Sequence, residues 1–318
     1  MKITLQGKAG TEVELGESEL ASIVPRPQAK DHKYTRGVLG VICGSEDYPG
    51  AALMSTRAAV NTGPGMVRFI GNAQLNFQVQ NYSPEVVCSN DAPEDVRVQA
   101  WAAGSGATSR SRQEEITHTI HATEAAVLDA AAVDIAGRWV GTEGQLEPHK
   151  ILTPHAGELK DFLQWIHVLN ETRWQEVVAS VGNPDREHIE KEPRRWARIA
   201  AELSGATILL KGATTVIASP TGETVSINGG TSWLATAGSG DTLTGILGAL
   251  LAQHEAHRQQ SGDAKPEAST YARLAACAVR IHHRAAALVH SDGLEGPVPP
   301  SAVATHISAA TASFLACR

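Results

Sequence analysis

The sequence predicts an α/β protein with a mainly parallel central sheet, and three observations lead to that fold class. Short continuous apolar runs recur along the chain, which is the pattern of strands buried on both faces. Segments with apolar residues at helical spacing separate most of those runs, as in repeated β-α units. The 318 residues are 42% hydrophobic and 19% charged, so the chain has ample material for the core of such a domain.

Residues 1–20 alternate loosely and predict a short edge strand, and residues 21–36 predict an exposed lead-in. A helix is expected over "PGAALMSTRAAVNTG" (49–63), because Pro49 stands near its start and Gly63 at its stop. The apolar runs predict strands at "GVLGVICG" (37–44), "MVRFIG" (66–71), "AWAAG" (100–104), "AAVLDA" (125–130), "KILTP" (150–154) and "ATILLKG" (206–212).

The pattern of alternating strands and helices changes after residue 212. "TTVIASPTGETVSING" (214–229) predicts a β-hairpin, because two β-branched runs flank a Ser-Pro-Thr-Gly turn. Further helices are expected around residues 270–290 and 301–316. Two polar stretches, 170–196 and 255–268, interrupt the pattern and are interpreted as surface insertions, since the sheet pattern resumes after the first.

Composition excludes several classes of protein. The net charge of −7 and the absence of a dense Lys/Arg run argue against partners such as nucleic acid or anionic membrane surfaces. The four cysteines lie far apart without a CxxC pair, which argues against structural zinc and a disulfide scaffold. No segment resembles a signal peptide or a spanning helix. The sequence therefore predicts a cytoplasmic protein that binds neither nucleic acid nor membrane.

The stretch "TAGSGDTLTGILGALLAQ" (236–253) places glycines and one carboxylate directly before an apolar helix. A helix start exposes unpaired N–H groups at its positive end, and glycines let an anion approach them closely. Asp241 falls in the first turn, where the positive end is expected to keep it ionised and able to accept a proton from a substrate hydroxyl. The alternative is a plain helix cap. The stretch is neither a Walker A loop nor a dinucleotide-binding fingerprint.

Five segments together resemble one family, the ADP-dependent NAD(P)H-hydrate dehydratases of the ribokinase-like superfamily. They occur in the order "GSEDYPGAALMSTRAAVNTGPGMVRFIG" (44–71), "AAGSGAT" (102–108), "LTPHAGELKDFL" (152–163), "LLKGATTVIASPTG" (209–222) and "LATAGSGDTLTGILGALLAQ" (234–253). The resemblance implies a ribokinase-like fold, with helices on both faces of the sheet and a hairpin before the anion-binding helix. It also implies a stand-alone dehydratase domain over residues 33–318, after an N-terminal extension at 1–32.

The chemistry that this resemblance implies is the repair of hydrated nicotinamide cofactors. The S form of hydrated NADH or NADPH would be dehydrated to NAD(P)H with ADP as phosphoryl donor, and AMP and phosphate would be released. Phosphorylation makes the C6 hydroxyl a good leaving group, which the ring nitrogen can expel. The family also implies Mg²⁺ and a homo-oligomer, with a tetramer among its forms. Two alternatives remain: a small-alcohol kinase of the hydroxyethylthiazole or hydroxymethylpyrimidine type, and a nucleotide-binding protein with little turnover.

Site residues carry over from the family motifs to matching positions of this sequence. Catalysis would use the Asp241 carboxylate as base, with the turn of Gly238, Ser239 and Gly240 stabilising the transferred group. The hydrated dinucleotide would contact Asp241 as well as Ala51, Gly106 and His155. The nucleotide would contact Gly240 and the segment Lys211, Gly212, Ala213, Thr214 and Thr215.

Several of these positions also have purely structural explanations. Lys211 fits a solvated charge in a strand-to-hairpin turn, and Gly106 fits a tight turn. His155 fits a satisfied structural residue. Glu158, which would hold magnesium and phosphate, stands in a first helical turn, where acidic residues are favoured regardless of function.

One segment departs from the family pattern. "VLDAAAVD" (127–134) keeps Asp129 but has Ala131 where the family usually has a second aspartate, so metal or water would be organised differently. Asp134 stands three residues further on and could replace it only with a local shift. The pairs His254/His257 and His282/His283 lack an acidic third ligand and are interpreted as surface or helix-packing residues.

Overall fold

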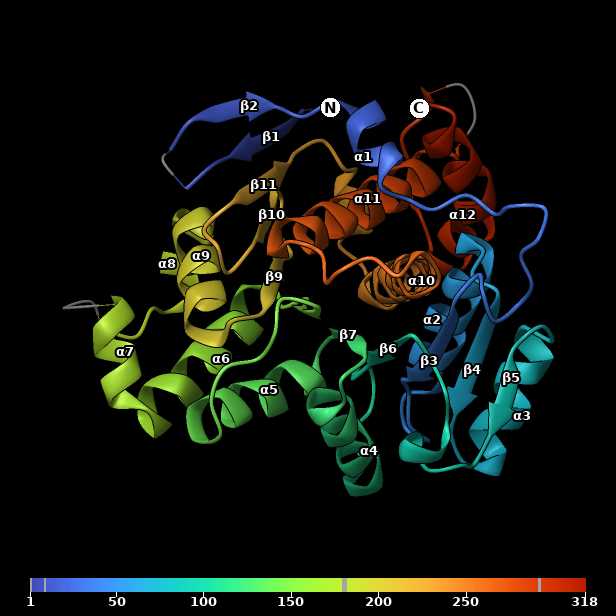
Figure 1. Cartoon of the computed structure of the whole chain (residues 1–318), viewed down its shortest axis with the longest axis horizontal. Coiled ribbons are helices and arrows are strands. Elements are labelled where there is room, and N and C mark those ends of the chain that lie inside the picture. The colour runs from blue at the N-terminus through green and yellow to red at the C-terminus, as the bar shows by residue number, and fades with distance from the viewer. Residues whose placement is uncertain (1, 9, 179–181, 291–292) are drawn as a thin grey trace.

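A central sheet of eleven strands runs through the part of the chain that this computed structural model describes, residues 2–8, 10–178, 182–290 and 293–318 (Figure 1). The strand order is β2-β1-β11-β10-β9-β8-β7-β6-β3-β4-β5. Helices cover both faces of the sheet, so the predicted α/β class is confirmed. Within these residues no helix combines the length and the apolarity needed to cross a bilayer.

The parallel part of the sheet holds the strands that the apolar runs predicted. Its residues are buried on both faces for most of their length, which is why the runs are continuous. β5, with the half-polar sequence "VCS", was not predicted because it lacks such a run. The strands are β3 (Val38–Ile42), β4 (Met66–Ile70), β5 (Val87–Ser89), β6 (Ala100–Ala103), β7 (Ala125–Leu128), β8 (Lys150–Leu152) and β9 (Thr207–Leu210).

One helical layer packs on the first face of the sheet. It consists of α2 (Pro49–Thr62), α3 (Ala73–Tyr82), α10 (Ser239–Ser261), α11 (Ala268–Ala287) and α12 (Pro300–Leu315), with the short α1 (Glu17–Ser22) against the last two. α10 is buried along most of its length. It approaches α2 so closely that a Cβ at Gly245 would lie 2.2 Å from the Ser55 carbonyl oxygen. This packing fixes the direction in which the start of α10 points.

The second layer covers the opposite face. It consists of α4 (Arg110–His121), α5 (Ala131–Thr142), α6 (Ala156–Leu169), α7 (Glu171–Val178), α8 (Arg186–Lys191) and α9 (Pro193–Ser204). The interpretation of residues 170–196 as a surface insertion was wrong. Trp174 and Trp196 are each only 2% exposed and belong to the core, while the charged side chains that hid this pattern lie on the outer faces of the helices. Residues 179–181 lie outside the described residues.

The interpretation of residues 255–268 as an insertion was wrong for its first half. α10 continues to Ser261, and Glu255 is 5% exposed. Its carboxylate accepts a hydrogen bond of 3.0 Å from Tyr271 Oη and pairs with Arg258 at 2.8 Å. A charged residue can therefore be buried when it is paired, which a hydrophobicity pattern does not detect.

The antiparallel part of the sheet begins with the predicted hairpin, β10 (Thr215–Ala218) and β11 (Thr224–Ile227). The prediction of a short edge strand in residues 1–20 is confirmed, but the segment also contains a second, interior strand that was not predicted. β1 (Ile3–Gln6) pairs with β11 inside the sheet, and only β2 (Glu12–Glu14) forms its edge. The open side of β11 accepts β1, and Ile3 is buried there.

Candidate active site

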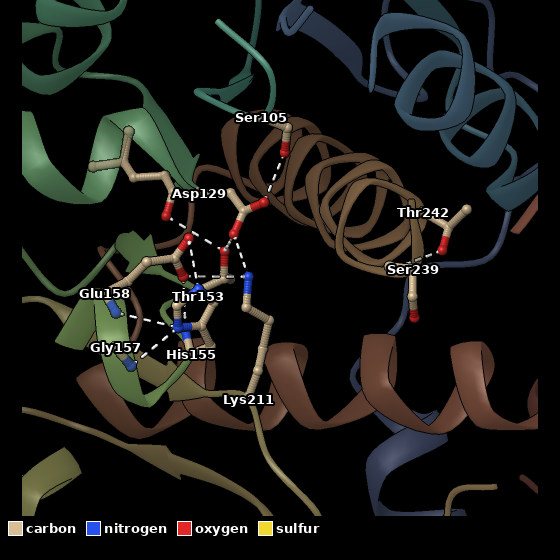
Figure 2. A network of polar contacts seen from close by, with 10 residues as sticks. Ser105, Asp129, Thr153, His155, Gly157, Glu158, Lys211, Ser239 and Thr242 are labelled. Atoms are coloured by element: carbon tan, nitrogen blue, oxygen red, sulfur yellow. Dashed lines mark hydrogen bonds and ion pairs between the residues drawn. The ribbon is translucent and has the colours of Figure 1, made fainter. Parts of the chain in front are cut away.

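Polar side chains meet at the carboxyl ends of four neighbouring parallel strands (Figure 2). Ser105 follows β6, Asp129 follows β7, Thr153 follows β8, and Lys211 follows β9. Carboxyl ends of parallel strands are where open α/β sheets bind their ligands. The topology thus brings residues distant in sequence into one cluster.

Asp129 is the centre of this cluster. Its Oδ1 accepts from Lys211 Nζ at 2.7 Å and from Thr153 Oγ1 at 2.8 Å, and its Oδ2 accepts from Ser105 Oγ at 2.7 Å. The side chain is almost fully buried. Burial alone would raise the pKa of Asp129, but the ammonium of Lys211 and the three hydrogen bonds outweigh it and leave that pKa below its usual value.

A close approach of two backbones sets the position of Asp129. Gly104 has φ +113°, and a Cβ there would lie 1.9 Å from the Asp129 carbonyl oxygen, so only glycine fits. The next residue, Ala130, has φ +47° and ψ −113°, a conformation that non-glycine residues rarely adopt. Backbone strain of this kind concentrates at functional sites.

The glycine-rich turn before α10 lies against this cluster. Gly238 caps the helix with φ +93°, and a Cβ on Gly240 would lie 3.6 Å from Lys211 Nζ and 3.8 Å from Asp129 Oδ2. First-turn amides have no acceptor within their helix. Among the described residues no other acceptor takes the amides of Gly240 and Asp241. Those N–H groups are free to bind an anion.

The pKa of Asp241 differs from the sequence-based expectation. The helix N-terminus alone would lower it and keep the carboxyl ionised. In the structure the pKa is raised, first because the side chain is partly buried and then because the charge of Asp129 lies nearby. Ser105 and Lys211 offset part of this rise. A raised pKa makes the carboxylate a better proton acceptor.

His155 and Glu158 form a reciprocal helix cap beside Lys211. His155 Nδ1 accepts from the amides of Gly157 at 3.0 Å and Glu158 at 3.2 Å, and Glu158 Oε2 accepts from the His155 amide at 2.8 Å. In the neutral ring the proton therefore lies on Nε2, which is 3.6 Å from Glu158 Oε1 on a largely exposed side chain. Glu158 Oε2 is also 3.7 Å from Lys211 Nζ. The structural explanation of both residues holds, and it leaves the His155 ring at the site.

Comparison with known proteins identifies the family. Residues 39–307 match the profile of the NAD(P)H-hydrate dehydratase family. The chain belongs to this family. It is 35% identical over 303 residues to a bifunctional NAD(P)H-hydrate repair enzyme of Mycobacterium leprae, covering 94% of this chain and 56% of that protein. The chain thus spans about half the length of the bifunctional relatives it matches.

Two further comparisons support the same family and its fold. An ADP-dependent (S)-NAD(P)H-hydrate dehydratase of Neisseria meningitidis is 33% identical over 237 residues, with 72% of this chain and 74% of that protein covered. A Bacillus subtilis NAD(P)H-hydrate dehydratase co-crystallised with ATP and Mg²⁺ has the same fold, with a TM-score of 0.71 and 24% identity over 94% of this chain and 97% of that one. The predicted ribokinase-like fold and the family resemblance are confirmed.

The small residues of the family motifs pack against each other. Gly106 has φ +63°, and a Cβ there would lie 2.7 Å from the Ala51 Cβ. Ala51 is buried at the start of α2, whereas Tyr48 at its N-cap is exposed. The loop after β6 and the first turn of α2 therefore touch, which keeps both backbones at the rim of the cluster.

The segment after β9 forms an exposed turn. Lys211 pairs with His155 as a parallel β-bridge, and its amide donates to the Pro154 carbonyl at 2.8 Å. Gly212 and Ala213 are exposed, and the Thr214 hydroxyl donates to Asn228. Thr215 is different, because it is buried as the first residue of β10.

Two connections in this site were not predicted. The first is the set of hydrogen bonds that Asp129 accepts from Ser105, Thr153 and Lys211. Its only signal in the sequence is that each of these polar residues follows an apolar run. The bond between Thr242 and His282 had no signal in the sequence.

Asp134 does not replace the second aspartate that the family usually has at the position of Ala131. Asp134 Oδ1 accepts from Trp165 Nε1 at 2.6 Å, and its Oδ2 pairs with Arg138 at 2.6 Å. Both of its oxygens are therefore engaged in the second layer, one by α6 and the other by its own helix α5.

Proposed function

We propose that this chain dehydrates the S form of hydrated NADH or NADPH, with ADP as the phosphoryl donor. The observation that carries the proposal is the contact between the turn at Gly238–Asp241 and the Lys211–Asp129 pair. This arrangement provides a proton acceptor, free amides and a cation at one point, which are the requirements of phosphoryl transfer to an alcohol. The Neisseria relative, an ADP-dependent (S)-NAD(P)H-hydrate dehydratase, supports the same reaction.

Asp241 would act as the base. Its carboxylate accepts the proton of the C6 hydroxyl while that oxygen forms a bond to the terminal phosphorus of ADP and the bond to the AMP oxygen breaks. The Gly240 and Asp241 amides, with Gly238 and Ser239 shaping their turn, are oriented to stabilise negative charge that develops on the transferred group. The residue is partly buried, which limits the number of water molecules that compete with the substrate hydroxyl.

Lys211 would hold the phosphates. Its ammonium is a compact point charge positioned by Asp129 and Glu158, and phosphate oxygens are suitable additional partners. The phosphate ester then leaves C6 as the ring nitrogen lone pair forms an iminium ion, and loss of a proton from C5 yields the dihydronicotinamide. Phosphate and AMP are the other products.

The remaining family residues would bind the two substrates. Gly212, Ala213 and Thr214 line the turn beside Lys211, and Thr215 would contribute through the backbone of β10. His155, Ala51 and Gly106 lie where the hydrated dinucleotide would approach.

The residues also fit Mg²⁺, which would neutralise phosphate charge when bound. Mg²⁺ usually takes one or two carboxylates together with phosphates and waters. Glu158 and Asp129 provide two carboxylates that converge on one cation, at present the Lys211 ammonium. Glu158 is the ligand we propose, because it retains more exposure than Asp129.

The deciding experiment is turnover of hydrated NADH with ADP and Mg²⁺, followed by the absorbance of the reduced nicotinamide. We expect NADH to form, with AMP and phosphate as coproducts. An accumulating phosphate ester on a small alcohol would support the kinase alternative instead. ADP binding by calorimetry without any turnover would support the alternative of a nucleotide-binding protein.

Replacing Asp241 tests the assignment of the base. Asp241→Asn removes the proton acceptor and keeps the shape, so the rate should fall by roughly 100- to 10,000-fold or more while ADP binding is largely retained. Asp134→Asn is the matched control, because that carboxylate is bonded to Trp165 and Arg138 outside the cluster and its loss should leave the rate nearly unchanged. A near-normal rate in Asp241→Asn would refute the assignment.

We also propose a location, an assembly state and domain bounds for this protein. A net charge of −7 supports a cytoplasmic protein without nucleic-acid or membrane partners. We propose a homo-oligomer, with the tetramer as the form to test by light scattering. We also propose that residues 33–318 form the catalytic domain, although β1 and β2 of the segment 1–32 complete its sheet.

A further inference from the structure

A histidine from another helix is bonded to the first turn of α10. His282, in the second half of α11, places Nε2 2.9 Å from Thr242 Oγ1, and both side chains are buried. Thr242 Oγ1 is in turn 2.7 Å from the carbonyl oxygen of Ser239 (Figure 2). A chain of two hydrogen bonds therefore connects α11 to the turn that holds Asp241.

The donors and acceptors of this chain can be assigned. The Ser239 carbonyl only accepts, so the Thr242 hydroxyl proton is directed to it. Thr242 Oγ1 must then accept from His282, which places a proton on Nε2. Burial, followed by the charge of His283, lowers the pKa of His282 to about 3, so the ring stays neutral near pH 7. Its second ring nitrogen then carries no proton.

The turn needs such an external anchor because its own backbone is permissive. Gly238 has φ +93°, Gly240 follows two residues later, and the approach at residues 235–237 is exposed. Thr242 makes two hydrogen bonds across the turn: its amide donates to the Gly238 carbonyl at 3.1 Å, and its hydroxyl donates to the Ser239 carbonyl. Asp241 lies in the sequence between Ser239 and Thr242, so these bonds restrict its backbone. α11 is packed in the core and provides a rigid support.

We propose that His282 is a positioning residue for phosphoryl transfer, which acts through Thr242 on the amides and the carboxylate of the α10 turn. The inference rests on the proposed function, since it assigns His282 to the same site. Most of the proposed nucleotide contacts, those of Lys211 and the turn after β9, lie outside the α10 turn, which would contribute only Gly240. A displacement of the α10 turn should therefore lower kcat and leave the KM for ADP nearly unchanged.

Four variants test the chain of bonds. His282→Leu removes the donor and Thr242→Val removes the hydroxyl at nearly constant shape. We expect each to lower kcat about 10-fold or more while the KM for ADP changes by less than about threefold. His282→Gln, which keeps an N–H donor of similar reach, should recover most of the kcat. The double variant should be no slower than the slower single variant, because both substitutions break the same chain.

A second readout does not depend on activity. Amide hydrogen exchange of residues 240–243 should become faster in His282→Leu and in Thr242→Val, because the first turn loses its anchor. His149→Leu is the matched control: His149 is also buried, but it precedes β8 at the opposite end of the strands. We expect it to lower the melting temperature without changing kcat or the exchange of the α10 turn.

The outcomes separate this inference from the proposed function. Wild-type kcat together with wild-type exchange in Thr242→Val would overturn the role of His282, even if hydrated NADH is the substrate. A parallel loss of kcat and a rise in KM in every variant, without rescue by His282→Gln, would also overturn it. If the wild-type chain does not form NADH, the proposed function fails, and the exchange data still decide whether His282 anchors the turn. Thr242→Val makes that decision if His282→Leu does not fold.

Discussion

Asp129 and Asp241 share one environment and have opposite pKa shifts. Asp129 is buried and Asp241 is partly buried, which raises the pKa of each, but Asp129 has Lys211 and two hydroxyl groups as direct partners, so its pKa falls below the usual value. Asp241 has the negative charge of Asp129 nearby, so its pKa stays raised. Carboxylates whose environments push their pKa values apart have different roles. Asp129 is thus a fixed anion that holds Lys211, and Asp241 is the group that exchanges a proton.

The charge of Lys211 couples these two roles. Its ammonium favours the ionised form of Asp241, so Lys211→Met should raise the pKa of Asp241 further. The acid limb of kcat/KM should then move to higher pH, and the KM for ADP should rise roughly 10- to 100-fold through the loss of charge-assisted hydrogen bonds. A pH-rate profile of both proteins measures this.

Lys211→Arg is the control, because it keeps the charge and should leave the acid limb near its wild-type position. An acid limb that moves to lower pH in Lys211→Met would contradict the coupling.

Part of this residue-level picture follows from the sequence. The turn at Asp241 and the segment at Lys211 could be predicted, because each is a local motif beside an apolar run. The role of Asp129 could not, since its partners Ser105 and Thr153 are each 24 residues away and Lys211 is 82 residues away. The raised pKa of Asp241 was missed for the same reason: it depends on burial and on Asp129 more than on its own helix.

At the level of elements, strands buried on both faces were predicted well from the sequence, and helices buried on only one face were predicted poorly. Strands buried on both faces appear as uniform apolar runs, so β3, β4 and β6 to β9 could be located from the sequence. α7, α8 and α9 could not, because each buries one face and exposes charges on the other. Trp174 and Trp196 show the problem, since each is a core residue inside a segment dominated by charge.

The close contact between Gly104, which follows β6, and Asp129, which follows β7, can be tested by substitution. Gly104→Ala places a Cβ 1.9 Å from the Asp129 carbonyl oxygen at φ +113°, so the end of β7 must move. Gly144→Ala has a similar φ of +121° but no atom within 4 Å, so it carries backbone strain alone. We expect Gly144→Ala to cost about 1–2 kcal/mol and Gly104→Ala about 2 kcal/mol more, measured by chemical denaturation.

Activity gives the second part of the comparison. Gly104→Ala should also lose turnover, because Asp129 shifts with β7, whereas Gly144→Ala should keep it. Equal losses of stability in the two variants would show that the contact at Gly104 does not set the position of β7.

At the scale of the whole molecule, one sheet joins the parallel strands, the later hairpin and the N-terminal strands. The parallel strands supply the site, and the antiparallel strands β10, β11, β1 and β2 extend the sheet beside it. The mainly parallel character of the sheet could be predicted from the apolar runs and the family resemblance. The insertion of β1 next to β11 could not be predicted, because that pairing joins Ile3 to Ile227 and depends on which strand edge remains open.

Histidines buried in this framework make its stability depend on pH. Burial is the first cause that lowers the pKa of His282 to about 3, and those of His149 and His283 to about 4. Their unfolded value is near 6.5. Below that pH the unfolded chain binds protons that the folded chain does not, so the stability that is present above about pH 6.5 is lost as the pH falls toward about 4.

We therefore expect the melting temperature to be level from about pH 8 to about pH 6.5 and to fall steeply below it. With three groups at about 1.4 kcal/mol per pH unit each, the slope approaches roughly 4 kcal/mol per unit near pH 5. Asp241, with its raised pKa, works in the opposite direction, but it is one group against three. Thermal unfolding over this range measures the slope, and His149→Leu should reduce it by about one third. A melting temperature that stays constant down to about pH 5 would mean that these histidines accept protons in the folded state, and the neutral His282 that donates to Thr242 would then be absent at acid pH.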